Sequence, residues 1–103
     1  MVQRRKTLIW SVKSGKQVAD ILRFYTERNK SDMYSRKLSE MFISTMDRVA
    51  LMPYIGKQTE KENVRCVIVR EFKIFYEVKS ITVEVLYVRD SRQNPKNNPF
   101  KEL

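Results

Sequence analysis

The sequence predicts an α+β domain in which a helix hairpin packs on one face of a mainly antiparallel four-stranded sheet, in the order β-α-α-β-β-β. Two patterns lead to this prediction. Apolar residues recur at helical spacing in the first half of the chain, and strand-forming residues gather in three short runs in the second half. A length of 103 residues fits one domain with its own core, so we expect a single domain over residues 1–103, with about 96–103 as a frayed tail.

The first half of the chain predicts one strand and two helices. Residues Lys6–Val12 are rich in strand-forming side chains, and Ser14 can cap the helix that follows. After a short polar break, Ser31 or Asp32 can cap a second helix, which Pro53 ends. Because the break is short, the helices should form a hairpin. The side chains expected to face the sheet are Val18, Ile21, Leu22, Phe24 and Tyr25 in the first helix, and Tyr34, Leu38, Met41, Phe42, Val49 and Met52 in the second.

The second half predicts a loop and three strands. Proline and glycine punctuate the polar segment Pro53–Asn63, which we expect to be a loop. Strands follow over Val64–Val69, Phe72–Val78 and Ile81–Val88. Only Arg70-Glu71 and Lys79-Ser80 separate them, which predicts two tight hairpins. Asn94-Pro95, Asn97 and Pro99 then disfavour further regular structure.

Two-residue turns fix which side chains share a face of the sheet. Val69 would pair with Phe72, and Val78 with Ile81. An almost wholly apolar face that includes Tyr87 would then lie against the helices. The opposite face is mixed and holds Cys66, Ile68, Lys73, Phe75, Glu77, Thr82, Glu84, Leu86 and Val88. So much apolar surface on an outer face predicts that something covers it. Two covers remain open: the chain's own tail, through Phe100 and Leu103, or a partner chain.

Charge and residue content limit the classes of function. The chain has 21 Lys and Arg against 12 Asp and Glu, a net charge of +9 that would attract RNA, DNA or an acidic protein. One cysteine excludes an internal disulfide, and without histidine we expect neither a zinc site nor another metal or cofactor. No apolar run approaches the roughly 20 residues of a membrane span, and none follows Gln3-Arg4-Arg5-Lys6 as a secretion signal would. We therefore expect a cytoplasmic protein that does not associate with membranes.

Four segments in this order resemble the RelE/ParE toxin superfamily: "LMPYIGK", "VRCVIV", "FKIFYEV" and "VEVLYVRDSRQNP". The resemblance runs from Trp10 to Pro95. It implies a toxin of a type II toxin–antitoxin pair, of the plasmid-stabilisation type, neutralised by a cognate antitoxin encoded beside it. Members of this superfamily have one of two activities. RelE-like toxins cut mRNA in the ribosomal A site without a metal, whereas ParE-like toxins act on DNA gyrase.

By position, Lys73 matches a basic site of the ribonucleases, and Arg89 or Arg92 matches the basic end of their last strand. The chain departs from the nuclease pattern because it lacks histidine and has no tyrosine after Arg92. It also has valines in the strand Val64–Val69 where the ribonucleases place basic residues. A guanidinium stays charged at any working pH and is a poor proton shuttle.

The bases that remain, Glu77 and Glu84, have reference pKa values near ~4.3. The "MPYIG…VR" pattern also resembles the ParE side of the superfamily more than the RelE side. We therefore favour ParE-like binding of gyrase over RelE-like cleavage of mRNA, and assign no catalytic residue. Whether the protein is an enzyme stays open; if it is one, it would be a metal-independent mRNA endoribonuclease. A basic nucleic-acid-binding module without toxicity is an alternative of another class.

Each candidate site residue also has a structural interpretation. Arg89 and Arg92 would bind phosphate or a protein target, or would simply end a strand in solvent. Arg65 would more simply bond loop carbonyls or a helix end, and Lys73 is either a site or a surface residue. The candidate antitoxin contacts on the mixed face are Ile68, Phe75, Leu86 and Val88. The sequence leaves the oligomeric state open.

Overall fold

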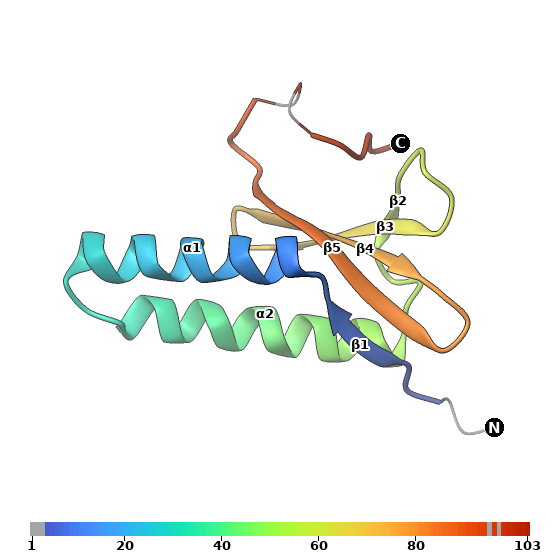
Figure 1. Ribbon diagram of the computed structural model, residues 1–103, viewed down its shortest axis with the longest axis horizontal. Coiled ribbons are helices and arrows are strands. Elements are labelled where there is room, and N and C mark those ends of the chain that lie inside the picture. Colours follow the sequence, from blue (N-terminus) through green and yellow to red (C-terminus); the bar gives the residue numbers. More distant parts are fainter. Residues whose placement is uncertain (1–3, 95, 97) are drawn as a thin grey trace.

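The computed structural model describes residues 4–94, 96 and 98–103. Two helices lie side by side on one face of a sheet, and the end of the chain lies over the opposite face (Figure 1). The elements are β1 (Thr7–Trp10), α1 (Val12–Asn29), α2 (Met33–Leu51), β2 (Lys57–Gln58), β3 (Val64–Val69), β4 (Phe72–Val78) and β5 (Thr82–Asp90). The predictions that involve Gln3, Pro95 and Asn97 fall outside the described residues. No helix in the described part of the chain has the length and apolar character needed to cross a membrane.

The sheet has five strands in the order β1-β5-β4-β3-β2. Strand β1 is parallel to β5, and the other neighbours are antiparallel. This confirms the α+β class and the two-layer arrangement, but the count of four strands was wrong. The additional strand is β2, which pairs Lys57 with Cys66 and Gln58 with Arg65 inside the predicted loop. Two polar residues carry no alternation of hydrophobicity, so the sequence pattern could not reveal this strand.

Helix α1 begins earlier than predicted, and its first turn is tied to β5. The cap is Ser11, whose Oγ accepts a hydrogen bond of 3.0 Å from the Ser14 amide. Ser14, the predicted cap, is buried inside the first turn, and its Oγ donates to the Val85 carbonyl at 2.9 Å. At the start of α2, Asp32 occupies the cap position, but its side chain makes no capping hydrogen bond. Ser31, the other predicted alternative, accepts a hydrogen bond of 3.2 Å from the Met33 amide through its Oγ.

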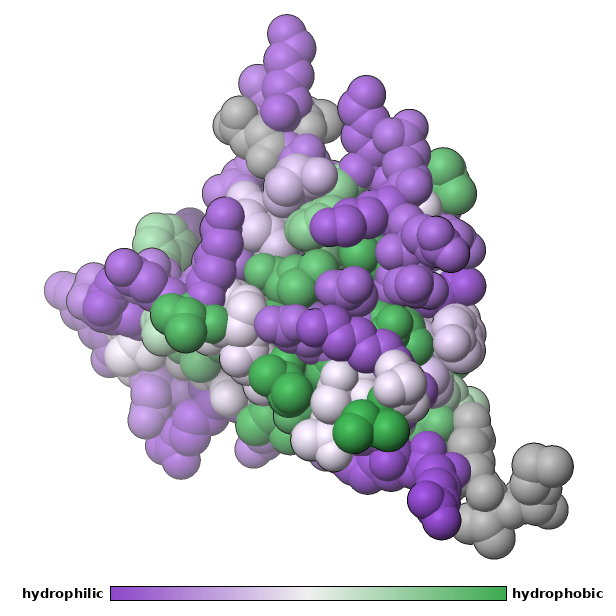
Figure 2. All heavy atoms as spheres, turned by 45° about the vertical axis from the view of Figure 1, so that its right-hand side comes forward, coloured by the Kyte–Doolittle hydropathy of each residue, from purple (hydrophilic) through white to green (hydrophobic). Residues whose placement is uncertain are grey.

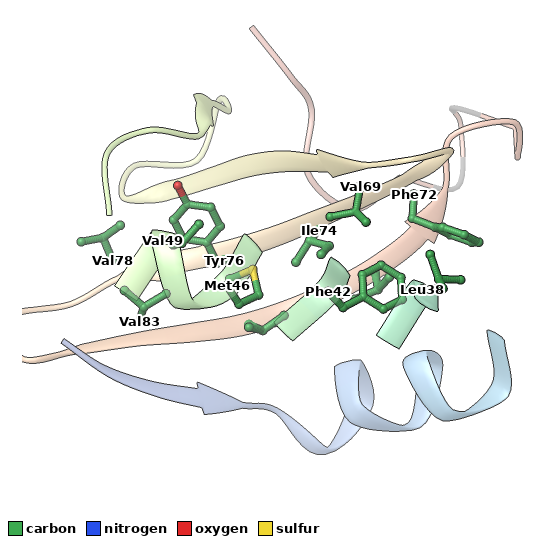
Figure 3. Packing of buried hydrophobic residues seen from close by; sticks show 12 residues of the cluster. Leu38, Phe42, Met46, Val49, Val69, Phe72, Ile74, Tyr76, Val78 and Val83 are labelled. Carbon is green, nitrogen blue, oxygen red and sulfur yellow. The ribbon is translucent and has the colours of Figure 1, made fainter. Parts of the chain in front are cut away.

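The core lies between the helices and the face of the sheet that they cover, which we call the inner face (Figure 3). Its buried members are Leu38, Phe42, Met46 and Val49 from α2, with Val69, Phe72, Ile74, Tyr76, Val78, Val83, Val85 and Val88 from the sheet. Most of the predicted helix faces are confirmed, including Ile21 and Tyr25. The assignment of Phe24 and Met52 to the buried face was wrong, because 53% and 39% of their surfaces are exposed. The sequence interpretation also missed Met46, which is fully buried.

The β3–β4 hairpin has the predicted register, with Val69 opposite Phe72. The β4–β5 hairpin does not, because Val78 pairs with Val83 instead of Ile81. The turn is displaced towards Ser80-Ile81, and the Lys79 amide bonds the Thr82 carbonyl at 2.9 Å. Lys6 stabilises this turn, since its Nζ donates to the carbonyls of Lys79 and Ser80 at 2.7 Å each.

A β-bulge at Leu86 changes which side chains of β5 face the helices. Tyr76 pairs with Val85 and Phe75 pairs with Tyr87, so Leu86 has no partner in β4. The extra residue reverses the alternation beyond it. Val88, predicted on the mixed face, therefore lies in the core, and Tyr87, predicted on the apolar face, lies with Phe75 on the outer face.

The outer face is covered by the end of the chain, which was predicted to fray. Phe100 packs against a small buried cluster of Val64, Cys66 and Phe75, with Leu86 and Tyr87 beside it. Glu102 forms an antiparallel bridge with Thr59, next to β2. Of the two predicted covering residues, Phe100 covers the face, whereas Leu103 is 67% exposed.

Candidate functional site

A cleft of about 440 Å³ lies between α1 and the second half of β5. It exists because β1 pairs only with residues Thr82–Val85 of β5, which leaves the rest of β5 as a sheet edge. Gln17 of α1 partly satisfies this edge, since its Oε1 accepts a hydrogen bond of 2.7 Å from the Val88 amide. We call this hollow the β5 cleft.

The β5 cleft has an aromatic wall and a basic rim. Tyr25 and Phe72 contribute rings to it, and their centroids are 6.4 Å apart in an edge-to-face arrangement. Phe24 stands exposed on α1, and the Arg28 guanidinium lies 6.0 Å from its ring centroid. Together with Arg92, Arg28 gives the rim two exposed guanidinium groups. Guanidinium groups form bidentate hydrogen bonds with carboxylates and phosphates, and they stack on aromatic rings.

Arg92 is held in place by Asp90. Its Nε and Nη2 donate to the two carboxylate oxygens of Asp90 at 2.9 and 2.6 Å, and its backbone amide bonds Oδ1 at 2.9 Å. The hydrogen bond from Arg92 holds the pKa of Asp90 below its usual value, although partial burial opposes this shift. The Arg92 side chain is nevertheless 67% exposed, so the guanidinium is oriented but still open to a ligand.

Tyr25 and Glu71 form a second polar group at the same end of the cleft. The Tyr25 hydroxyl donates to Glu71 Oε1 at 3.1 Å. Burial raises the pKa of Tyr25, and the hydrogen bond to Glu71 raises it further, whereas neighbouring Arg92 lowers it. The tyrosine, the carboxylate and the guanidinium therefore lie close together.

Arg89 is buried, with 5% of its surface exposed. Its Nη2 donates to the carbonyls of Gln93 and Asn94 at 2.6 and 3.4 Å, which fixes the turn that follows β5. The side chain lies on the outer face beside Lys73, its partner across the strands, and it also borders the β5 cleft. Arg89 thus supports the segment that carries Arg92.

The other two candidate cations lie elsewhere. Lys73 is on the outer face and pairs with Glu102 at 2.5 Å. Arg65 donates to the carbonyls of Tyr54 and Gly56 at 3.2 and 2.8 Å, and its guanidinium lies 5.1 Å from the Tyr54 ring centroid. These contacts match the structural interpretation of Arg65, in which it bonds loop carbonyls. The structure therefore brings Arg92 and Arg89 to the cleft and places Lys73 and Arg65 away from it.

The four candidate antitoxin contacts do not form one exposed surface. Ile68 is 65% exposed on the outer face, and Leu86 is half-buried there. Phe75 is fully buried beneath Phe100, and Val88 is in the core. On the side of the molecule drawn in Figure 2, hydrophobic residues form small groups between long hydrophilic side chains.

Sequence reasoning missed Gln17, Arg28 and the Tyr25–Glu71 pair. One signal was available for Arg28, because Phe24 and Arg28 are four residues apart and so share a helix face. None was available for Gln17, whose role depends on β1 being shorter than β5. Among the described residues, no group of three or more Cys, Asp and Glu side chains gathers as a metal site would require.

Comparison with known proteins gives the family. The profile of a family described as "ParE toxin of type II toxin-antitoxin system, parDE" matches residues 8–95. A solved structure titled "Chromosomal ParDE TA system from P. aeruginosa" has the same fold, with a TM-score of 0.69 and 14% sequence identity. The match covers 84% of this chain and 96% of that one. A search of individually curated proteins found no match.

The chain is a toxin of the RelE/ParE superfamily. More particularly, it belongs to the ParE toxin family of type II toxin–antitoxin systems, which supports a cognate antitoxin as its partner.

Proposed function

We propose that this toxin arrests growth by binding an essential macromolecular target through the basic rim of the β5 cleft, and that DNA gyrase is the target. The observation that supports this most is the pair of exposed guanidinium groups of Arg28 and Arg92 over an aromatic wall. Asp90 orients Arg92, and Arg89 holds the turn behind it. Arg92 is therefore preorganised for binding, since its side chain has little order to gain when a target docks.

The titratable groups of the cleft favour binding over proton transfer. General acids and bases work best when their pKa lies near the working pH. Here the pKa of Asp90 is lowered by Arg92, and the pKa of Tyr25 is raised by burial and by Glu71. At neutral pH, Asp90 is therefore a bonded carboxylate and Tyr25 a bonded phenol, so neither is poised to exchange protons.

One observation favours a second candidate function, ribosome-dependent cleavage of mRNA. Tyr25, Glu71 and Arg92 lie together, and an acid, a base and a fixed positive charge are the groups that cleavage at a ribose 2′-hydroxyl needs. The variant Tyr25→Phe separates the two functions, because it removes only the hydroxyl. It should abolish cutting if the protein is a nuclease, and should leave growth arrest intact if the protein acts by binding.

The proposed function is tested by inducing the chain in bacteria without its antitoxin. We expect growth to stop with a DNA-damage response while mRNA stays intact by primer extension. The double variant Arg28→Ala/Arg92→Ala should restore growth. Arg48→Ala is the matched control, since it removes an exposed guanidinium from the last turn of α2, away from the cleft, and should remain toxic.

Two other outcomes would contradict the proposal. Cuts at fixed codon positions that require ribosomes would identify a nuclease. Normal growth with the unaltered chain, together with salt-sensitive binding of naked nucleic acid, would instead identify a basic binding module without toxicity.

We also propose that the antitoxin contacts the outer face through Ile68 and Leu86. Both are at least partly accessible beside the end of the chain, whereas Phe75 could contribute only after that end moved away.

A further inference from the structure

The last residues of the chain bind the sheet in the way a short extended peptide would. The Glu60 amide donates to the Lys101 carbonyl at 2.7 Å, and the Leu103 amide donates to the Gln58 carbonyl at 3.4 Å. Glu102 is bridged to Thr59 in an antiparallel sense. The C-terminal segment, Phe100–Leu103, therefore runs along β2 at one edge of the sheet, on the side away from the helices (Figure 1).

Two side chains of the C-terminal segment make specific contacts with the outer face. The Phe100 ring lies 5.4 Å from the Phe75 ring and 6.5 Å from the Tyr87 ring, measured between centroids. Two residues further on, the Glu102 carboxylate pairs with Lys73, and about a quarter of each side chain is exposed. An extended peptide places alternate side chains on one side, so a single strand supplies both contacts.

The positive charge around this site suits an acidic peptide. Besides Lys73, the Lys61 ammonium lies 5.8 Å from the Phe100 ring centroid, and Lys57 is on β2 opposite Cys66. Lys101, between the two contact residues, is exposed, and it contributes its backbone carbonyl to the pairing with Glu60. Next to Lys73 across the strands, Ile68 is 65% exposed, so a longer partner would find more apolar surface there.

We propose that the outer face is a docking site for an extended acidic segment of the antitoxin. This segment would carry an aromatic residue two positions before an acidic residue, as Phe100 precedes Glu102. In the isolated toxin, Phe100–Leu103 occupies this site as an internal substitute, and the antitoxin segment displaces it. Strand addition at a sheet edge gains affinity from main-chain hydrogen bonds and specificity from pockets for alternate side chains. This docking site rests on the antitoxin contact with the outer face proposed above, and does not depend on the cellular target.

Cys66 reports whether the site is covered. It is the one cysteine of the chain, it lies beneath Phe100, and only 4% of its surface is exposed. Burial raises the pKa of its thiol to about 12, and the nearby Glu102 carboxylate adds to this shift. Because the thiolate is the reactive form, a covered Cys66 should react slowly with a thiol reagent at pH 8.

The experiment compares thiol reaction rates in full-length variants. Phe100→Ala and Glu102→Gln should each speed the reaction of Cys66, by about tenfold or more for the loss of the ring. Lys101→Ala is the matched control and should react like the unaltered chain. Circular dichroism and denaturation curves establish that each variant is folded. If Phe100→Ala is not, Lys73→Ala serves as the test, because it breaks the ion pair with Glu102 and keeps the carboxylate that raises the pKa of Cys66.

A synthetic peptide then tests the docking site directly. The peptide NPFKEL, the sequence of residues 98–103, should slow the reaction of Cys66 in Phe100→Ala, whereas NPAKQL should not. A labelled copy of NPFKEL should bind the same variant, and binding should be lost when Lys73→Glu is added.

Three results would overturn the proposal. The first is a Cys66 rate that is unchanged in both tail variants. The second is a failure of NPFKEL to protect the thiol or to bind. The third is protection of the unaltered chain that grows with its own concentration, because a second copy would then supply the covering segment. None of these results bears on growth arrest, so the proposed function is tested separately.

Discussion

Leu86 and Tyr87 are neighbours in the chain, yet both side chains lie on the outer side of the sheet. Successive residues of a regular strand point to opposite faces, and the bulge at Leu86 breaks this rule. The bulge turns Tyr87 outward to meet Phe75 and Phe100, and turns Val88 inward to the core. Beyond the bulge, Arg89 lies opposite Lys73 on the outer face, and Asp90 lies opposite Phe72.

The first prediction tests this reversal. Val88→Ala should lower the free energy of unfolding by about 2 kcal/mol, because it leaves a cavity among side chains from both layers. Ile68→Ala removes more carbon atoms but from an exposed position, so it should cost no more than about 0.5 kcal/mol. Urea denaturation measures both values. If the two variants were equally destabilised, Val88 would not be a core residue.

The second prediction concerns the two glycines. The Gly56 amide donates to the Tyr76 hydroxyl at 2.9 Å, and that hydroxyl donates to the Pro53 carbonyl at 2.8 Å. A β-carbon on Gly56 would lie 2.3 Å from the Tyr76 oxygen and 3.0 Å from the Cys66 carbonyl oxygen. Gly56→Ala should therefore break the hydrogen bond between the residue 56 amide and the Tyr76 hydroxyl. The crowding and the lost buried hydrogen bond together should destabilise the fold by about 3 kcal/mol.

Gly15→Ala is the matched control for that prediction. A β-carbon on Gly15 would meet nothing within 4 Å, and the residue is in the first turns of α1. Because alanine favours a helix more than glycine does, the change should stabilise the fold by about 0.5–1 kcal/mol. Thermal denaturation would contradict the structure if both alanine variants shifted the melting temperature in the same direction.

The third prediction concerns pH. The hydrogen bond from Arg92 lowers the pKa of Asp90 in the folded chain, so the folded state favours the carboxylate. Asp90 should therefore add stability above the pKa of about 4 that it has when unfolded, and this contribution should vanish as the pH falls through its lower folded value. The difference in stability between the unaltered chain and Asp90→Asn should be largest near neutrality and should shrink below about pH 4.

Urea titrations at several pH values between neutrality and pH 3 make this measurement. Asp47→Asn is a control, since the Asp47–Arg5 pair is about half exposed at both ends and should contribute little at any pH. If the difference in stability between the unaltered chain and Asp90→Asn grew on acidification, the stated direction of the Asp90 pKa shift would be wrong.

The fourth prediction concerns the sheet edge beside the cleft. Gln17→Ala removes the acceptor of the Val88 amide and should cost about 1 kcal/mol, because that amide must then bond water. Gln17→Glu keeps an oxygen acceptor and should cost less. Amide hydrogen exchange at Val88 checks this locally, and equal exchange rates in the two variants would argue against the contact.

The sequence predicted the parts of the fold that depend on composition and spacing. The stripes of Ile21 and Tyr25 in α1 and of Leu38 and Phe42 in α2 define the helix hairpin, and the strand run Phe72–Val78 has the predicted bounds. These features are local, since the period of apolar residues records the face that is buried.

The features that the sequence did not predict depend on contacts between distant segments. Ser11 replaces Ser14 as the cap because Ser14 bonds Val85, 71 residues away. Strand β2 exists through its pairing with β3, and the bulge at Leu86 has no characteristic residue type. The candidate site followed the same pattern. The basic end of β5 was predicted, whereas Gln17 lines the cleft, and Glu71 bonds Tyr25, only once α1 and the β3–β4 turn meet β5.

Gyrase supercoiling in vitro tests the central claim most directly. Relaxed plasmid, purified gyrase and ATP are incubated with the unaltered toxin, with Arg28→Ala/Arg92→Ala, or with Arg48→Ala. We predict that the unaltered toxin and Arg48→Ala inhibit supercoiling, and that the double variant inhibits at least about tenfold less, since two charged contacts are lost. Undiminished supercoiling with every protein, alongside ribosome-dependent cuts in mRNA, would contradict the account.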